Sequence, residues 1–319
     1  MEKLKLLILV VISVILTINL FSKRFERHWN TSSDLGISYL HSKAIKNFEN
    51  PYKVMPEFMR KNEKYPPYFP LSYIIVAFVD YLGEFTRFEH FAQIWTKIAY
   101  FNNYFTDFIL GYFFSVIFKN LKVKFSPLIG YSLAISIITQ RLIFKKSVEQ
   151  FDAFAFDLTL WSLFFLIFKR YYLGGLFLGL GLSFKQSFIF LIPVIFYYIF
   201  RFESPRSAFK FIGSFAITCS IIFLPFLFSG AYETIDATII FHLTRDAIRS
   251  FLGYYIPYSS FIFPSFVKLS VILYLVTLYI SITYKARPLI TFTLVPASFL
   301  LFHKYPLEQY IVTLLYCSL

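Results

Sequence analysis

The feature that most constrains the fold is a succession of long apolar runs that extends along almost the whole chain. Of 319 residues, 57% are hydrophobic and only 15% are charged, against about 25% charged in ordinary soluble domains. A helix that crosses a bilayer needs about 20 apolar residues. We therefore predict an all-α, polytopic membrane helical bundle with about nine to eleven membrane segments. The runs fall near 4–21, 68–82, 98–118, 126–144, 153–168, 173–200, 209–228, 266–284 and 288–302, with weaker ones at 251–265 and 308–319.

The sequence predicts one integral membrane domain over 1–319, without a soluble domain or an internal repeat. The first run follows Lys3 and Lys5 and lacks a small-residue cleavage site, so we expect a retained first helix rather than a removed signal peptide. These patterns predict a multi-pass protein of the cell membrane, or of the endoplasmic reticulum in a eukaryote. The basic residues that flank the first run are balanced on its two sides, so they do not choose an orientation.

Two polar segments interrupt the apolar pattern. The first, 23–67, is rich in charged residues and is expected to form a loop that contains a helix. The second, 229–250, places His242, Arg245 and Arg249 on one helical face and apolar side chains on another. That pattern is typical of an amphipathic helix at the membrane interface.

The charge and the metal-binding residue types exclude several classes of function. The formal net charge is +13, but the basic residues lie mostly in short connections between apolar runs. Contact with membrane lipid headgroups is therefore expected, and binding to nucleic acid is not. The two cysteines, Cys219 and Cys317, lie inside apolar runs, and the five histidines lack the spacing of metal ligands. We expect no metal and no cofactor.

Few acidic residues remain as candidates for chemistry, because most lie in connections where water solvates them. Ser32 or Ser33 could cap a helix that begins near Asp34 and ends before Asn50-Pro51. Asp34 could then be a general base at the membrane surface or an ordinary acid at a helix N-terminus. A second group, Glu149, Asp152 and Asp157, heads another apolar run, and it could equally be a solvated turn. Asp107 shares a helical face with Asn103, which favours a structural contact between helices.

A single cation divides the longest apolar run. The run 173–200 is too long for one untilted span and contains Lys185 and Gln186 near its centre. A charge this far from both ends of a run is costly in lipid. The sequence therefore predicts two shorter helices that meet at a polar point, with Lys185 facing a polar cavity.

In order along the chain, several segments resemble polytopic glycosyltransferases of the GT-C superfamily, in particular its mannosyltransferase-like branch. The resemblance rests on an acid before a helical loop segment, an Asn-Pro-Tyr turn, a Tyr-Pro-Pro entry, a Gly-Gln-x-Asp-like element, a Gly-rich helix ending in Lys, and a late Glu-Gln-Tyr-like element. In the fourth element, Glu149 stands where relatives carry Gly. The corresponding residues are Asp34, Asn50-Pro51-Tyr52, Tyr65-Pro66-Pro67, Glu149-Gln150-Phe151-Asp152, Gly174 to Lys185, and His303 to Tyr310.

The resemblance implies transfer of a sugar, possibly mannose, from a polyprenyl-phosphate donor to a hydroxyl of a lipid or glycan acceptor, with inversion. It implies no cofactor. By this resemblance Asp34 is the base and Asp152 is a second acid that shapes the sugar pocket. The groups that would hold the donor phosphate are Arg245, His242, Arg249 and Lys185, and secondary candidates are Gln150, Glu149, Lys304 and Gln309.

Alternatives remain open. If 68–82, 98–118 and 126–144 all cross the membrane, Asp152 lies on the side opposite Asp34; the two acids share one side only if 68–82 is a partial or interfacial segment. The broken run at Lys185 would also suit a transporter or flippase for a lipid-linked or anionic substrate. A catalytically inactive relative that binds the donor is a third possibility, favoured by Glu149.

Overall fold

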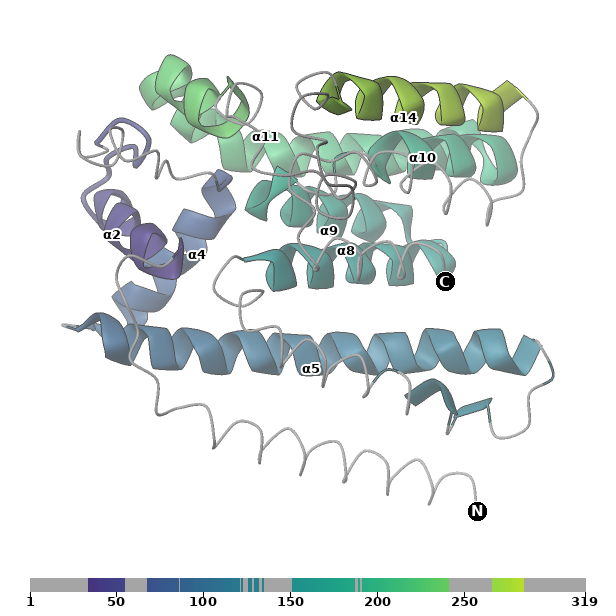
Figure 1. Cartoon of the computed structure of the whole chain (residues 1–319), viewed down its shortest axis with the longest axis horizontal. Coiled ribbons are helices and arrows are strands. Elements are labelled where there is room, and N and C mark those ends of the chain that lie inside the picture. Colours follow the sequence, from purple (N-terminus) through teal and green to yellow (C-terminus); the bar gives the residue numbers. More distant parts are fainter. Residues whose placement is uncertain are drawn as a thin grey trace, which may run out of the picture.

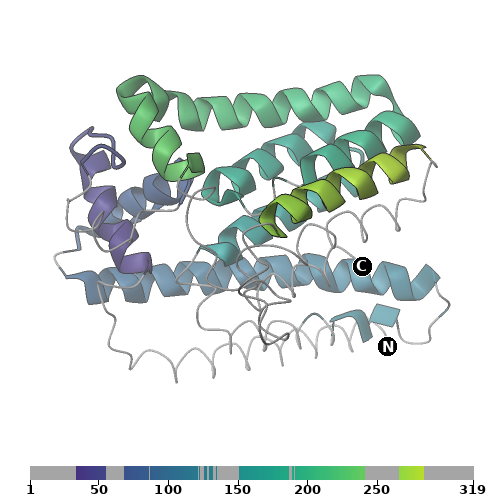
Figure 2. The ribbon, with the colours of Figure 1, turned by 45° about the horizontal axis from the view of Figure 1, so that its top comes forward.

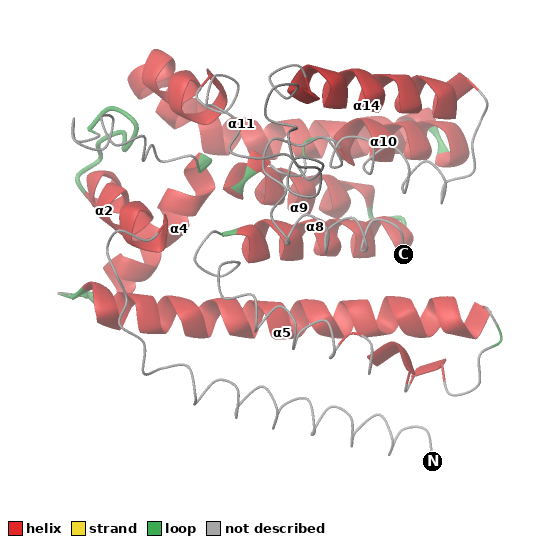
Figure 3. Ribbon diagram, viewed as in Figure 1, coloured by secondary structure: helices red, strands yellow, loops and turns green. Residues whose placement is uncertain are grey.

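The computed structural model describes residues 34–54, 68–85, 87–120, 151–186, 191–240 and 266–283, together with a few positions between 122 and 134 and at 189. Every regular element in these ranges is a helix (Figure 3). The predicted all-α class is confirmed for this part of the chain. The apolar runs 4–21, 251–265, 288–302 and 308–319 lie outside the described residues, as does most of 126–144.

Two short helices form one end of the molecule (Figure 1). Helix α2 (Asp34–Lys46) belongs to the polar first segment and packs against α4 (Pro70–Gly83). The predicted end of the first helix is confirmed, because α2 ends at Lys46, before Asn50-Pro51, while the residues before Asp34 lie outside the described ranges. Helix α4 has 14 residues, so it is only about 21 Å long.

The longer helices lie side by side (Figure 1). Helix α5 (Phe88–Asn120) has 33 residues and begins ten residues before the apolar run predicted at 98. Helices α8 (Asp152–Ile167) and α9 (Tyr171–Phe184) are antiparallel neighbours, and α9 also packs along α11 (Pro205–Ile235). Helix α10 (Leu191–Tyr198) continues into the π-helical turn η2 (Ile199–Glu203), and α14 is Phe266–Thr283.

The end of α11 bends sharply, as Figure 2 shows. The bend lies at Gly230, whose φ of 179° and ψ of 77° are not helical. Beyond it the helix continues to Ile235 and into the π-helical turn η3 (Asp236–Ile240). The described part of the predicted interfacial segment 229–250 is therefore helical and joined to α11, while 241–250 lie outside the described residues.

The apolar helices have the composition expected for contact with lipid. Among the described residues one helix, Pro205–Ile240, is long and apolar enough to cross a membrane, and α4, α8, α9 and the end of α14 contain shorter apolar helices. Large apolar side chains such as Ile217, Ile221 and Phe228 on α11 are 63%, 69% and 85% exposed. Exposed apolar surface of this extent is typical of a face that meets a membrane or another protein.

Candidate functional site

The structure describes the side chain of only one predicted site residue, Lys185. Asp34 and Asp152 are placed by their backbone: Asp34 is the first described residue of α2, and Asp152 is the first residue of α8. The remaining candidates lie outside the described residues: Glu149, Gln150, His242, Arg245, Arg249, Lys304 and Gln309.

Lys185 lies at the break between two helices, as the sequence predicts. Helix α9 ends at Phe184, and Lys185 has extended backbone angles of φ −156° and ψ 137° before α10 begins at Leu191. The side chain is 9% exposed, and its Nζ lies 5.4 Å from the centroid of the Tyr68 ring. A cation over an aromatic face is attracted by the ring quadrupole, which offsets part of the cost of burying the charge. The predicted break between two helices at Lys185 is therefore confirmed, and the group beneath the cation is the Tyr68 ring.

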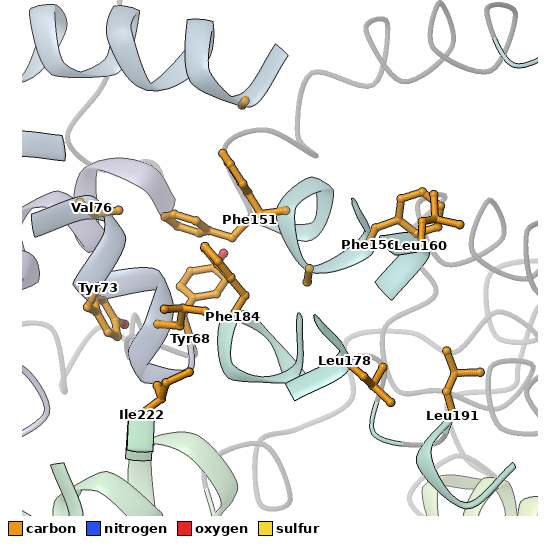
Figure 4. Close-up of a cluster of buried hydrophobic side chains, with 14 of the residues drawn as sticks. Tyr68, Tyr73, Val76, Phe151, Phe156, Leu160, Leu178, Phe184, Leu191 and Ile222 are labelled. Atoms are coloured by element: carbon orange, nitrogen blue, oxygen red, sulfur yellow. The ribbon is translucent and has the colours of Figure 1, made fainter. Parts of the chain in front are cut away.

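Tyr68 connects three helix ends. Its ring packs edge to face against Phe151, with centroids 4.9 Å apart, and its carbonyl oxygen accepts a hydrogen bond of 2.8 Å from the Tyr52 hydroxyl. The next residue, Phe69, donates its N–H to the carbonyl oxygen of Phe184 at 3.3 Å. Figure 4 shows Tyr68, Phe151 and Phe184 converging between the surrounding helices. The start of α4, the start of α8 and the end of α9 therefore meet at this point.

Phe151 fixes the start of α8 and hence the backbone of Asp152. It is fully buried and has a left-handed backbone with φ 59° and ψ 0°. That conformation costs a non-glycine residue about 1–2 kcal/mol. Ring contacts hold it there, since Trp95 lies 5.3 Å from Phe151 and 5.0 Å from Phe154 in centroid distance. Strained residues of this kind are concentrated at functional sites.

Helix α2 reaches the same end of the molecule through a chain of aromatic contacts. Tyr39 lies 4.6 Å from Phe91, Phe91 lies 5.9 Å from Trp95, and Trp95 contacts Phe151. Helix α4 is too short to cross a hydrocarbon core of about 30 Å. The contact between Trp95 and Phe151 places the start of α8 beside the first turns of α5. This arrangement puts α2 and the start of α8 at one end and, because α4 is short, favours the interpretation of 68–82 as a partial segment.

The Asn-Pro-Tyr turn has a packing role that spacing alone could not reveal. The Asn50 side-chain amide donates to the Phe226 carbonyl oxygen at 3.0 Å, and to the Ser229 and Thr234 hydroxyls at 3.1 and 3.2 Å. Its Oδ1 accepts the Tyr52 N–H at 2.9 Å. We name this set of contacts the Asn50 staple. It joins the first polar segment to the bend of α11, from which the chain enters the predicted basic segment.

Two buried acids that the sequence did not single out as partners have structural roles. Asp80 on α4 is 1% exposed and its Oδ2 lies 2.6 Å from the Lys46 Nζ of α2. Asp157 on α8 is fully buried and accepts a 2.6 Å hydrogen bond from the Asn102 amide of α5. Both contacts join helices distant in sequence. Of the acids grouped at the head of α8, Asp157 is thus a helix-packing residue, while Asp152 occupies the helix start.

The chemical character of the site follows from these positions. A carboxylate is a side chain that can act as a general base towards an acceptor hydroxyl. Lys185 supplies a partly desolvated cation at the same end of the bundle, and such a group is suited to hold an oxyanion or a phosphate. Among the described residues no group of three or more His, Cys, Asp or Glu side chains could hold a metal ion. Comparison of the chain with models of known protein families and with curated proteins finds no match to either.

Proposed function

We propose that this chain is a polytopic membrane glycosyltransferase that moves a sugar, possibly mannose, from a polyprenyl phosphate to a hydroxyl of a lipid or glycan. The observation that carries the proposal is the meeting of helix ends at one end of the molecule. Helix α8 begins there at Asp152, helix α2 carries Asp34 as its first described residue, and helix α9 ends there in front of the buried Lys185. A base and a phosphate-holding cation are the two groups that this transfer needs.

The proposed step is an inverting displacement. The acceptor oxygen forms a bond to the anomeric carbon while the bond from that carbon to the phosphate oxygen breaks. The acceptor proton passes to the Asp34 carboxylate, and the polyprenyl phosphate leaves with the bonding electron pair. Lys185 and the basic segment with His242, Arg245 and Arg249 stabilise the negative charge that develops on the phosphate. Asp152 orients the sugar.

A membrane location is part of the proposal because the donor has a lipid tail. The long apolar helix Pro205–Ile240, the shorter apolar helices and the exposed apolar side chains of α11 support it. A chain with one face in lipid could take a polyprenyl donor from the bilayer while Lys185 meets its phosphate. The predicted runs outside the described residues would supply the remaining spans.

The test is transfer from a labelled polyprenyl-phosphate sugar by the purified full chain in detergent or nanodiscs. Because a general base contributes about 10²–10⁴-fold, Asp34→Asn is expected to lower kcat by at least about 100-fold. Glu49→Gln is the matched control, since Glu49 is an exposed acid of the same segment. Full activity of Asp34→Asn would remove Asp34 as the base, and no transfer by the wild-type chain with any polyprenyl-phosphate hexose would refute the proposal.

A carrier for a lipid-linked or anionic substrate is the second candidate, favoured by the break between α9 and α10 at Lys185. Carriers commonly bind substrate at discontinuous helices. The same preparation distinguishes the two functions when it is reconstituted in sealed liposomes. Movement of a labelled lipid-linked sugar across the bilayer without any product would favour the carrier, whereas product formation favours the transferase.

A further inference from the structure

A second polar region lies at the end of the bundle away from α2, where two turns are joined by an ion pair. One turn, 168–170, connects α8 to α9, and the other contains η2 and the start of α11. The Lys169 Nζ lies 2.9 Å from a Glu203 carboxylate oxygen, which also accepts a 3.0 Å hydrogen bond from the Tyr171 hydroxyl. The pairing raises the pKa of Lys169 and lowers that of Glu203, so both are charged at neutral pH. The pair fixes the two turns side by side.

The residues around this pair are strongly basic. Helix α5 also ends at this side, because Tyr112 stacks on Phe168 with centroids 6.2 Å apart. Within the described ranges, Glu203 is the only acid among these turns and helix ends, and its charge is matched by Lys169. We name the basic residues of this region the basic end: Lys119, Lys122, Lys169, Arg170, Arg201, Arg206 and Lys210.

Exposed aromatic side chains border the basic end. Tyr172 and Phe209 are 59% and 63% exposed, and Phe200 and Phe202 are 44% and 46% exposed. The Lys210 Nζ lies 5.5 Å from the centroid of the Tyr172 ring. Aromatic rings beside basic residues are typical of the boundary between hydrocarbon and headgroups, where the ring meets the acyl chains and the cation meets the phosphates.

The opposite end has a different charge pattern. Its described residues mix both signs, and the Asp80 charge is matched by Lys46. Short connections with an excess of Lys and Arg face the cytoplasm in membrane proteins. Described charged residues of this mixed end include Lys43, Lys53, Arg87, Glu49, Glu84, Glu89, Glu233 and Asp236.

We propose that the basic end is a binding surface for the anionic phospholipid headgroups of the cytoplasmic leaflet. That leaflet carries the negative surface potential that attracts clustered basic side chains at membrane boundaries. The bordering aromatic side chains fit a lipid surface rather than a nucleic acid or a soluble acidic protein. As a consequence α2 and the mixed end face the other side of the membrane. The inference rests on the membrane location proposed above but uses no residue of the proposed transfer site, so a failure of lipid binding and a failure of sugar transfer are distinguishable.

Lipid binding is tested by native mass spectrometry of the full chain released from micelles that contain phosphatidylglycerol and phosphatidylcholine. The wild type should retain phosphatidylglycerol preferentially. Arg201→Gln/Arg206→Gln should weaken its affinity for phosphatidylglycerol on the order of tenfold. Lys43→Gln/Arg87→Gln, which removes two exposed charges from the mixed end, is the matched control. It should leave the affinity for phosphatidylglycerol unchanged. Equal loss in both variants, or no preference in the wild type, would overturn the proposal.

Orientation is tested by labelling single cysteines in a chain whose native cysteines are replaced by serine. Asn47→Cys and Phe202→Cys are both at exposed positions, one at each end. In spheroplasts of a bacterial host, an impermeant maleimide should label Asn47→Cys at once and Phe202→Cys only after the membrane is opened. The reverse pattern would place the basic end outside the cell and would contradict the proposal, whatever the transfer assay shows.

Discussion

His41 is a buried titratable residue on the face of α2 that packs against α4. Its imidazole is 4% exposed and lies 6.3 Å from the Tyr73 ring in centroid distance. Burial lowers its pKa to about 4, although a hydrogen bond to the Pro51 backbone partly opposes this shift. The neutral imidazole is therefore the form that the folded protein holds at neutral pH.

We expect the protein to become less stable at acid pH, because the buried His41 must then be protonated. In the unfolded chain the pKa of His is about 6.5, so between about pH 6.5 and pH 4 the unfolded state binds more protons than the folded state. The contribution of His41 to stability is complete above about pH 6.5 and decreases as the pH falls. The difference between pH 8 and pH 5 is about 2 kcal/mol.

The measurement is thermal unfolding in detergent at both pH values for the wild type and for His41→Gln. The variant keeps a polar side chain of similar size but does not titrate. It should therefore lose less stability than the wild type at pH 5. The same loss in both proteins would show that burial of His41 is not the cause.

At the scale of elements, the glycines in the sequence of α9 explain its close packing against two neighbouring helices. Its glycines face two neighbours. A Cβ on Gly175 would collide with the Phe211 carbonyl oxygen of α11, and one on Gly179 would lie 2.9 Å from the Thr218 Cβ. On the other side, the Ser162 hydroxyl of α8 donates to the Gly174 carbonyl oxygen at 2.7 Å. Small residues four apart are typical of helices that pack closely in membranes.

Adding one methyl group to this contact should separate α9 from α11. Gly175→Ala is expected to destabilise the protein by about 1–3 kcal/mol, because the obstructing atoms belong to the backbone of α11 and cannot rotate away. Gly213→Ala is the matched control, since a Cβ there has no heavy atom within 4 Å. The control should be neutral or more stable by about 0.5–1 kcal/mol. Thermal unfolding measures both, and equal effects would contradict the packing argument.

The helix limits show which elements a sequence can predict. The end of α2 before Asn50-Pro51 and the break of the long run at Lys185 follow from local signals, namely an Asn-Pro turn and a charge within an apolar run. The start of α5 does not follow from a local signal, because its first turns, beginning at Phe88, are stabilised by ring contacts with Tyr39. The bend at Gly230 also lacked a local signal, since the same residues predict an amphipathic segment.

At the scale of the whole molecule, the contacts between distant segments could not be predicted. Asn50 and Thr234 are 184 residues apart in sequence but form a hydrogen bond. Lys185 and Tyr68, also distant in sequence, form a cation–π contact. Local patterns predicted that Lys185 meets a polar environment, but they could not identify Tyr68 or the Asn50 staple. The proposed function depends on such contacts, because they bring the helix ends together.

We therefore expect the hydrogen bonds of the Asn50 staple to hold the bend of α11 in its conformation. Asn50→Ala removes the side-chain amide that donates to the Phe226 carbonyl oxygen and to the Ser229 and Thr234 hydroxyls, together with the acceptor of the Tyr52 N–H. The Phe226 carbonyl oxygen keeps the two hydroxyls as donors. Because buried groups lose their hydrogen bonds, we expect the free energy of unfolding to fall by about 2–3 kcal/mol. Asn47→Ala, at an exposed position of the same segment, is the matched control and should change stability by less than about 0.5 kcal/mol.

Hydrogen exchange distinguishes this effect from general destabilisation. In Asn50→Ala the amides of 226–240 and of 50–54 should exchange faster together, because the staple joins the two segments, while those of α8 and α9 keep their protection. Asn50→Asp is the sharper variant. It retains the acceptor for the Tyr52 N–H but brings an anionic oxygen against the Phe226 carbonyl, so only 226–240 should lose protection. Unchanged exchange over 226–240 in both variants would show that the bend at Gly230 is held by apolar packing alone.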